Sequence, residues 1–367
     1  YEAGLKAFQE YNPIVDEFYG ATGDPQTANE RKLYRSRTYG KDAAFFMLDA
    51  RSFRDSQLWQ PNTSDLGDVA AFQQASFDAN RTMLGHIQLA DLKADLLAAQ
   101  QAGTTWKFVL VPEPIQNLGL QGAPDRFEGY AYERTQLLSY INANAIENVV
   151  FVSADIHGTV VNNLQYQTSA GGAQINTNAF DISTGSVAVT SPLGPRLAQA
   201  LPSNLQPVYQ SSSRPQKDLL LEQAVSVQLG NYGYSPIGLQ DAPFANRVEV
   251  LAPTAGNGSP YFVGHTFGWT KFAIDQATQN LTVTTYGVDL YNSSDLTNNP
   301  NNVINRQPEI MSQFRITPAG FTPPTATPIT PTATNVTPTA TSAIPSPSVM
   351  PTVTGTQQPV FIPLVMR

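Results

Sequence analysis

The sequence predicts an α/β domain built around a mostly parallel sheet. Apolar runs of strand length recur three times, at Ala44–Leu48, Trp106–Val111 and Val149–Val152. Uninterrupted runs of this kind are typical of strands that are buried on both faces. Segments with helical spacing of apolar residues separate them, and alternating strands and helices form βαβ units with parallel strands. Short strand candidates follow after Thr159, so the class is α/β with an α+β second half.

Helices are expected in three places in the first half. Tyr1–Gly20 begins with a helix that stops near Pro13. A second helix covers Thr82–Gln101, whose first residue is a suitable N-cap. A third covers Tyr130–Asn142, where apolar residues stay in helical register. The polar segment Gln57–Asn80 is expected to be a loop.

The second half is expected to contain short strands separated by Gly, Asn and Ser. The candidates are Val160–Tyr166, Ala179–Ile182, Val187–Thr190, Val248–Leu251, Trp269–Ile274 and Leu281–Tyr286. Gln276–Asn280 lies between two of these segments, which predicts a hairpin.

Composition narrows the class of partner. With 41% hydrophobic residues, the 367-residue chain can bury a sizeable core. The net charge of -8 argues against a nucleic acid as a structural partner and against an anionic membrane surface. The chain has no cysteine, and no apolar run approaches the roughly 20 residues of a transmembrane helix. Because it opens at Tyr1, without Met or a signal peptide, we interpret it as a piece of a longer precursor.

The end of the chain has a composition of its own. Ile316–Met366 contains no charged residue and repeats Pro and Thr. Such a segment cannot bury a core and favours an extended polyproline II spacer, with plain disorder as the alternative. We expect residues 316–359 to be a stalk outside the cell and 360–367 (VFIPLVMR) to be a short apolar end. Attachment of the protein to the cell surface through this tail is the corresponding hypothesis.

The strongest chemical signal is Asn148–Thr159, with the sequence NVVFVSADIHGT. Asp155 and His157 directly follow the buried strand, at the strand end where open α/β sheets bind ligands. Carboxylate and imidazole are both metal ligands, suited to Zn, Mn or Fe. A helix-capping Asp beside an ordinary loop His is the alternative. Gly158 would allow a sharp turn or a close backbone approach.

Two further strand ends carry charged side chains. Asp49 and Arg51 follow the first buried strand, and Glu113 follows the second. Because parallel strands have their carboxyl ends at one edge of the sheet, these residues should converge with Asp155 and His157.

Several stretches together resemble the PhoD-like alkaline phosphatases, a branch of the calcineurin-like metallophosphoesterases. The resemblance runs from Leu33 to Asp289 and is carried by LYRSRTYGKDAAFFMLDARSFRD (33–55), Thr105–Val111, DRFEGYAYER (125–134), NVVFVSADIHGT (148–159) and HTFGWTKFAIDQATQNLTVTTYG (265–287). The family usually shows Gly-Asp-x-His where this chain has Ala-Asp-Ile-His, a change that leaves both candidate ligands in place. The family also takes metal ligands from earlier acidic and Asn/His motifs, and Tyr1–Lys32 contains nothing similar.

The resemblance implies a fold and an organisation of the chain. The fold would be a metallophosphoesterase-like sandwich of two mixed sheets flanked by helices, with its N-terminal half missing. Residues 1–32 would be a linker or a remnant of the preceding part of the domain. Residues 33–315 would be the C-terminal part of the PhoD-like phosphatase domain.

The implied activity is metal-dependent hydrolysis of phosphate monoesters by a secreted or cell-surface bacterial alkaline phosphatase. The substrate would be a small phosphate ester. Phosphodiesterase or phospholipase D-like activity is the enzymatic alternative. A non-catalytic binding domain, displayed on a stalk, is the alternative of another class. The implied cofactor is a dinuclear centre of divalent or trivalent ions (Ca, Fe, Mn or Zn).

Under this resemblance Asp155 and His157 are the expected metal ligands and catalytic residues. His157 could instead hold the leaving oxygen as a neighbour of the metal centre. His265 could reach the site from the opposite sheet as a further ligand. His86 is expected to be a surface residue.

Further residues are expected to bind the substrate. Arg51 and Arg54 could offer guanidinium forks to phosphate oxygens, and pairing with a neighbouring aspartate is the structural alternative. Asp125 and Tyr130 are expected to line the pocket. Arg134, one helical turn on, is expected to brace a carbonyl or an acid.

Overall fold

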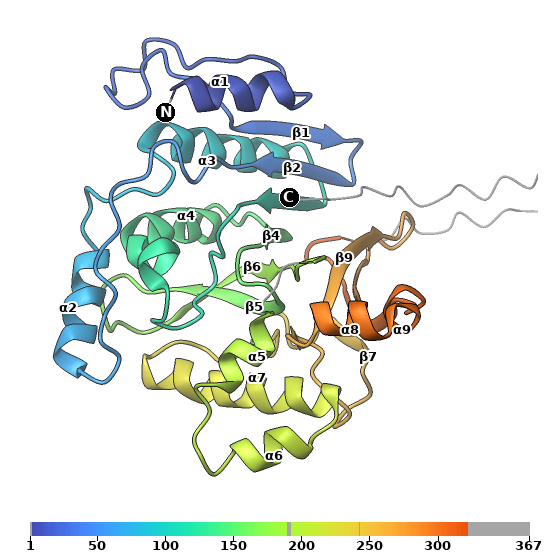
Figure 1. Cartoon of the computed structure of the whole chain (residues 1–367). Helices are drawn as coiled ribbons and strands as arrows, with labels where there is room; N and C mark the ends of the chain where they lie inside the picture. Colours follow the sequence, from blue (N-terminus) through green and yellow to red (C-terminus); the bar gives the residue numbers. More distant parts are fainter. Residues whose placement is uncertain (1, 189–191, 242, 322–367) are drawn as a thin grey trace, which may run out of the picture.

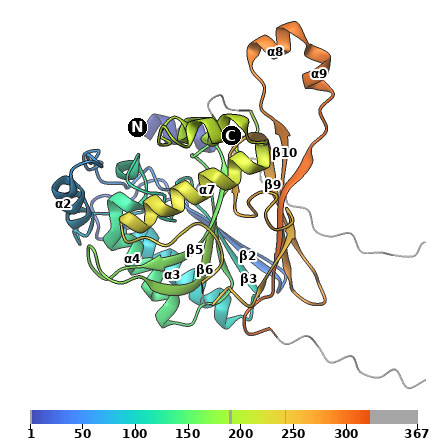
Figure 2. The ribbon, with the colours of Figure 1, turned by 90° about the horizontal axis from the view of Figure 1, so that it is seen from below.

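Two β-sheets pack face to face in the computed structural model, which describes residues 2–188, 192–241 and 243–321 (Figure 1). The larger sheet has the strand order β1-β2-β3-β4-β6-β5-β8, and the smaller sheet has the order β7-β11-β10-β9. Helices cover the face of the larger sheet that points away from the smaller one (Figure 2), and the two-sheet sandwich implied by the family resemblance is confirmed.

The element bounds are as follows. The larger sheet contains β1 (Arg35–Tyr39), β2 (Ala43–Met47), β3 (Trp106–Leu110), β4 (Val149–Ser153), β5 (Thr159–Tyr166), β6 (Ile175–Ser183) and β8 (Phe262–Val263). The smaller sheet contains β7 (Val248–Ala252), β9 (Thr266–Ile274), β10 (Leu281–Asp289) and β11 (Glu309–Ile316). The α-helices are α1 (Glu2–Tyr11), α2 (Leu66–Ser76), α3 (His86–Gln101), α4 (Ala131–Ala143), α5 (Leu193–Ala198), α6 (Gln206–Ser211), α7 (Arg214–Asn231), α8 (Ser293–Asn298) and α9 (Pro300–Ile304). Two short 3-10 turns, η1 (Ala123–Asp125) and η2 (Phe127–Tyr130), precede α4.

The three strands expected from apolar runs form the centre of the larger sheet. β2, β3 and β4 are neighbours and parallel, with Phe46 opposite Val109 and Val109 opposite Phe151. β6 continues the parallel set on the far side of β4. The predicted hairpin between β9 and β10 is also present, with Ile274 opposite Leu281.

Alternate residues of the central strands face two separate cores, as the two-residue period of a strand requires. Val149 and Phe151 belong to the core that contains the buried residues of α3 and α4. Val150 and Val152 belong to a second core, which includes Val283 of the smaller sheet and buried residues of α7. Figure 2 shows α3 and α4 on one side of the larger sheet and the smaller sheet on the other.

The segment Gln57–Asn80, expected to be a loop, contains the helix α2. Its N-cap is Asp65, whose carboxylate accepts hydrogen bonds from two backbone N–H groups of the first turn. Val69 and Phe72 on this helix are buried. Only two buried apolar residues in eleven give a weak helical periodicity, so the polar composition of the segment indicated a loop where a helix forms.

Two other local predictions need correction. α3 begins at His86 with Gly85 as its N-cap, three residues later than the expected N-cap Thr82. Thr82 accepts the N–H of Gly85 and donates to the carboxylate of Glu133, so its hydroxyl serves the turn before the helix. Val187 of the expected strand Val187–Thr190 lies in a bend, and the end of that segment is outside the described residues.

The folded part of the chain extends past the expected boundary at residue 315. Ile316 is fully buried in β11, opposite Leu281 and Val248. Ala319 N–H donates to Asn148 Oδ1 at 2.7 Å, and the Asn148 amide donates back to the Ala319 carbonyl at 3.1 Å. The expected stalk from residue 322 onward and the apolar end lie outside the described residues.

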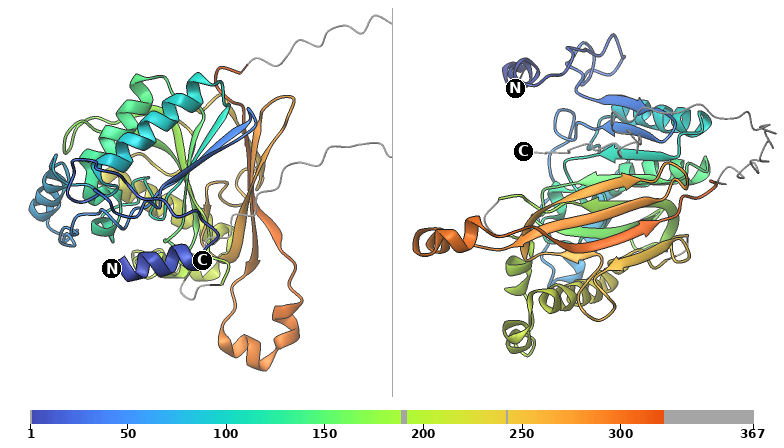
Figure 3. Two further views of the ribbon diagram at one scale, coloured as in Figure 1. Left: turned by 90° about the horizontal axis from the view of Figure 1, so that it is seen from above. Right: turned by 90° about the vertical axis from the view of Figure 1, so that its right-hand side faces the viewer.

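α8 and α9 connect β10 to β11 and project beyond the body of the sandwich (Figure 3). In the part of the chain that the structure describes, no helix has the combination of length and hydropathy needed to cross a membrane.

Candidate active site at the strand ends

The parallel register brings three charged strand ends to one edge of the larger sheet. β2, β3 and β4 run in the same direction, so Asp49, Glu113 and Asp155 leave the sheet at the same end. Asp49 and Glu113 are buried, whereas Asp155 is exposed. The predicted convergence of the strand ends is therefore confirmed.

The Asp155–His157 turn has an unusual backbone. Asp155 has φ 67° and His157 has φ 63°, both in the left-handed region that non-glycine residues rarely adopt. Such conformations cost on the order of 1–3 kcal/mol each and cluster at functional sites. Buried Ile156 anchors the turn between them. A Cβ on Gly158 would lie 2.7 Å from Leu193 Cβ, so glycine is needed here for close approach.

Arg51 and Arg54 converge on a single carboxylate. Arg51 Nη1 lies 2.8 Å from Asp125 Oδ1, and Arg54 Nη1 lies 2.5 Å from the same oxygen. The amide of Gln57 also donates to it. Burial raises the pKa of Asp125, but the hydrogen bonds from the two arginines outweigh that effect and hold the pKa below its usual value. Both arginines are thus paired, with a residue that lies far away in the sequence.

The backbone turn that follows β2 positions Arg51. Asp49 Oδ1 accepts the backbone N–H groups of Arg51 and Ser52 at 3.0 and 2.9 Å. The Arg51 guanidinium also forms an ion pair with Glu113. Asp49 therefore shapes the turn, whereas Glu113 and Asp125 are the ion-pair partners.

Glu113 is a buried carboxyl group at the end of β3. Its exposed fraction is 0%, and one of its oxygens contacts the Arg51 guanidinium. Burial raises the pKa of Glu113 to about 7, with the charge of Arg51 acting in the opposite direction. Such a group can change its proton occupancy near neutral pH.

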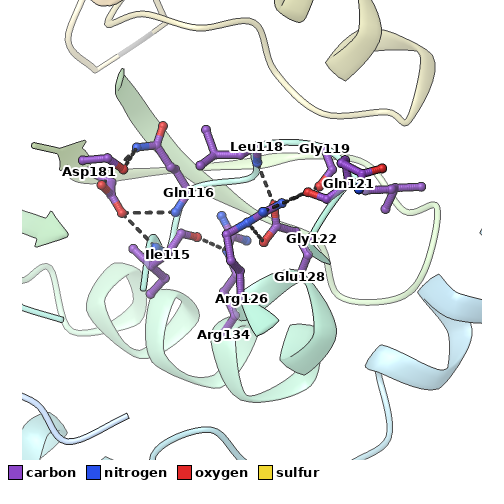
Figure 4. A network of polar contacts seen from close by, with 12 residues as sticks. Ile115, Gln116, Leu118, Gly119, Gln121, Gly122, Arg126, Glu128, Arg134 and Asp181 are labelled. Atoms are coloured by element: carbon purple, nitrogen blue, oxygen red, sulfur yellow. Dashed lines mark hydrogen bonds and ion pairs between the residues drawn. The ribbon is translucent and has the colours of Figure 1, made fainter. Parts of the chain in front are cut away.

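A buried polar network fixes the segment between Glu113 and Asp125 (Figure 4). Asp181 Oδ2 accepts the N–H groups of Ile115 and Gln116 at 2.8 and 3.2 Å. Arg134 Nε donates to the Ile115 carbonyl at 2.6 Å, as expected of a residue that braces a carbonyl. Burial raises the pKa of Asp181 to about 7 and lowers that of Arg134 to about 10.

The second half of the same segment is held by an ion pair. Glu128 Oε1 accepts the Leu118 N–H at 2.7 Å and lies 3.1 Å from Arg126 Nη2. That nitrogen also donates to the Gly119 carbonyl at 2.8 Å. The segment that presents Asp125 is therefore rigid. Sequence reasoning missed Asp181, Glu128 and Arg126, because their partners are set by tertiary contacts.

Tyr130 does not face an open pocket. Its ring is fully buried, and its hydroxyl donates to the Asp55 carbonyl at 2.7 Å. The guanidinium of Arg81 covers the ring at 4.8 Å from the centroid. Tyr130 thus supports the loop that carries Arg54, and the expectation that it lines the substrate pocket is not supported by this geometry.

The remaining histidines occupy contrasting places. His265 is buried, with Nδ1 2.6 Å from Asp218 Oδ1 and Nε2 2.7 Å from Tyr209 Oη. Because both ring nitrogens already contact protein atoms, the expected role of His265 as a metal ligand is not supported. His86 is exposed at the start of α3, where a surface residue was expected.

A two-metal centre needs more ligands than the described residues bring together. Among the described residues, no three or more Asp, Glu, His or Cys side chains gather closely enough to hold a metal ion. Asp155 and His157 are suitable donors by chemistry, but two side chains are too few for a dinuclear site. The described residues alone therefore do not fit the implied metal centre.

The two-sheet sandwich, with Asp, His and Arg side chains at the ends of its parallel strands, is a mixed α/β fold with a polar candidate site at one sheet edge. A family model described as PhoD-like phosphatase matches residues 1–239 of the chain. This match begins before Leu33 and ends before Asp289, the limits of the resemblance seen in the sequence. The chain belongs to the PhoD-like phosphatase family.

Two relatives are similar to parts of this chain. The chain is 30% identical over 144 residues to alkaline phosphatase D of Bacillus subtilis (strain 168), a match that covers 37% of this chain and 23% of that protein. A solved structure titled "Structure of PhoD" has a TM-score of 0.50 and 15% sequence identity, over 86% of this chain and 47% of that one. The second match shows the fold alone. The chain spans less than half the length of either relative.

Proposed function

We propose that this chain carries the phosphate-binding edge of a metal-dependent phosphate monoesterase. The observation that supports it best is the convergence of Arg51 and Arg54 on Asp125, with Arg51 close enough to Asp155 for their charges to interact, in a chain of the PhoD-like phosphatase family. Guanidinium groups bind phosphate oxygens in bidentate fashion, and these two are held at one point by Asp125.

Each residue has a proposed role in hydrolysis. Arg51, which is half-exposed, and Arg54 bind the oxygens of the phosphoryl group. His157 holds or protonates the leaving oxygen. Asp155 would offer its exposed carboxylate as a metal ligand, and His157 would be a second donor as the alternative to its role at the leaving oxygen. When bound, a two-metal centre would supply an activated water and positive charge, with further ligands from outside the described residues.

The proposal includes a bacterial protein that is secreted or held at the cell surface. The named relative is a bacterial alkaline phosphatase D, and the Thr/Pro-rich tail has the composition of an extracellular stalk. Alkaline monoesterase specificity is part of the proposal. Diester hydrolysis is an alternative outcome of its test.

The test uses the full-length protein in which this chain occurs. Hydrolysis of p-nitrophenyl phosphate and of bis-p-nitrophenyl phosphate is measured at alkaline pH with Ca, Fe, Mn or Zn supplied. We expect faster hydrolysis of the monoester, and loss of at least about a hundredfold in kcat with His157→Ala or Asp155→Asn. The control is His86→Gln, on an exposed histidine outside the site. Preference for the diester would reassign the substrate, and no hydrolysis with any ion would refute the enzyme function.

A further inference from the structure

His265 forms a buried unit with two side chains from other elements. Asp218 comes from α7 and Tyr209 from α6, and His265 directly precedes β9. The ring nitrogens lie 2.6 Å from Asp218 Oδ1 and 2.7 Å from Tyr209 Oη. All three residues are less than 10% exposed. The His265 imidazole therefore connects α6 and α7 to the start of β9 in the smaller sheet.

A short series of backbone contacts connects this unit to His157. The same Asp218 oxygen accepts the Gly264 N–H at 2.9 Å. The Gly264 carbonyl accepts the Gly194 N–H at 2.8 Å. Next to it, the Leu193 N–H donates to the His157 carbonyl at 3.0 Å. The first turn of α5 thus lies between the His265 unit and the Asp155–His157 turn.

The packing along this route leaves no room for displacement. A Cβ on Gly194 would lie 2.5 Å from His265 Cε1 and 2.7 Å from the Gly264 carbonyl oxygen. On the other side of α5, Leu193 closely approaches Gly158. Close-packed interiors transmit small shifts, so movement of the His265 ring would move the start of α5.

We propose that His265 is a positioning residue for His157. The Asp218–His265–Tyr209 unit packs against the start of α5 and fixes its position beside the Asp155–His157 turn. The hydrogen bond from the Leu193 N–H then holds the His157 backbone at φ 63°. A left-handed conformation in a non-glycine residue persists only where its surroundings fix it, and this route supplies such a constraint. The catalytic consequence rests on the proposed function, whereas the coupling between the two histidines does not.

The coupling can be measured without any activity, because the chain has three histidines and their NMR signals can be assigned by substitution. Tyr209→Phe removes the hydroxyl beside Nε2, and His265→Gln removes the ring. In both variants we expect the Leu193 amide to exchange about tenfold faster, the scale of one lost hydrogen bond to a charged or polar partner, and the His157 Hε1 resonance to shift. The amide of Val150 in β4 should keep its wild-type rate. The control His86→Gln should change none of these signals.

Two outcomes would overturn the proposal. One is a folded Tyr209→Phe variant with wild-type Leu193 exchange and an unshifted His157 resonance. The other is equal acceleration at Leu193 and Val150, which would mean that the unit stabilises the whole fold and not the turn. Should His265→Gln fail to fold, Tyr209→Phe decides the question. If the wild-type protein hydrolyses no phosphate ester but the variants show the expected changes at Leu193 and His157, the proposed function is refuted and the coupling stands.

Discussion

At the scale of single residues, the candidate site is a balance of nearby charges. Arg51 and Arg54 bring two positive charges to the strand ends, and Asp125 and Glu113 bring two carboxyl groups to meet them. A phosphate that binds these guanidinium groups must compete with the carboxylate of Asp125. Asp125 thus orients the two guanidinium groups and also lowers their affinity for a phosphate anion.

Asp125→Asn is expected to increase the affinity of the chain for inorganic phosphate by about tenfold, which corresponds to about 1.4 kcal/mol. The substitution removes the competing charge and keeps an oxygen that can accept from the arginines. Isothermal titration with phosphate measures the effect. Asp16→Asn, at an exposed position, makes the same change in net charge and should have no effect. Weaker binding by Asp125→Asn would mean that the carboxylate orients the arginines more than it blocks them.

Glu113→Gln is expected to flatten the dependence of stability on pH. Burial raises the pKa of Glu113 from 4.5 to about 7, so between these values the folded chain holds a proton that the unfolded chain has lost. The free energy of unfolding contributed by this group is therefore complete below pH 4.5 and is lost as the pH rises through about 7. Urea unfolding from pH 4.5 to 8 measures the slope. The exposed Glu10→Gln variant should keep the wild-type slope, and an unchanged slope in Glu113→Gln would contradict the prediction.

Part of this site could be predicted from sequence for a clear physical reason. Asp155, His157 and Arg51 directly follow strands, and the parallel rule places such residues at one edge of the sheet. The partner of Arg51 could not be found in this way, because Asp125 is 74 residues away and meets it only through folding of the intervening segment. The buried environments of Tyr130 and His265 likewise depend on contacts between distant elements.

At the scale of elements, the sequence signal was strongest where strands are fully buried. β2, β3 and β4 are apolar runs because both of their faces contact a core. β1 was missed because its sequence, RSRTY, lies at the edge of the sheet and is mostly exposed. α7 was also missed, although Ser213 and Gln216 form a capping box at its start, a signal that the sequence does contain.

Gly158→Ala is expected to destabilise the docking of α5 by about 1–3 kcal/mol, the usual cost of overpacking. The added methyl group would meet the Leu193 side chain at 2.7 Å. Chemical denaturation measures the change. Gly230→Ala in α7 is the matched control, since a Cβ there meets nothing within 4 Å and should stabilise the helix by about 0.5–1 kcal/mol. Equal stability of wild type and Gly158→Ala would show that α5 can move away without cost.

At the scale of the whole molecule, the described residues form a two-sheet sandwich whose strand ends bring together few candidate metal ligands. One hydrophobic core on each face of the larger sheet stabilises this fold. The described residues offer Asp155 and His157 as ligands, and the chain spans 47% of the solved PhoD structure that it resembles. The described residues therefore form a packed two-sheet fold without bringing together a full set of metal ligands.

The isolated 367-residue chain is expected to hydrolyse chromogenic phosphate esters weakly or not at all. Two side chains cannot hold a pair of multivalent ions against their hydration, so little activated water would form. Release of p-nitrophenol, measured with and without a chelator, tests this. Robust, chelator-sensitive turnover would contradict it and would mean that buried carboxyl groups such as Asp49 or Glu113 complete the centre.

The folded domain is expected to end between Arg315 and Phe321, which two truncated chains can test. A chain that ends at Arg315 loses Ile316 from the core and the paired hydrogen bonds between Ala319 and Asn148. Loss of one buried aliphatic side chain costs about 1.5–3 kcal/mol, which lowers the Tm of a domain of this size by about 5 °C. A chain that ends at Phe321 keeps these contacts and should melt like the full-length protein, as expected if the Thr/Pro-rich segment is an unpacked spacer. Equal destabilisation by both truncations would place part of that segment against the domain, and the spacer hypothesis would then be wrong.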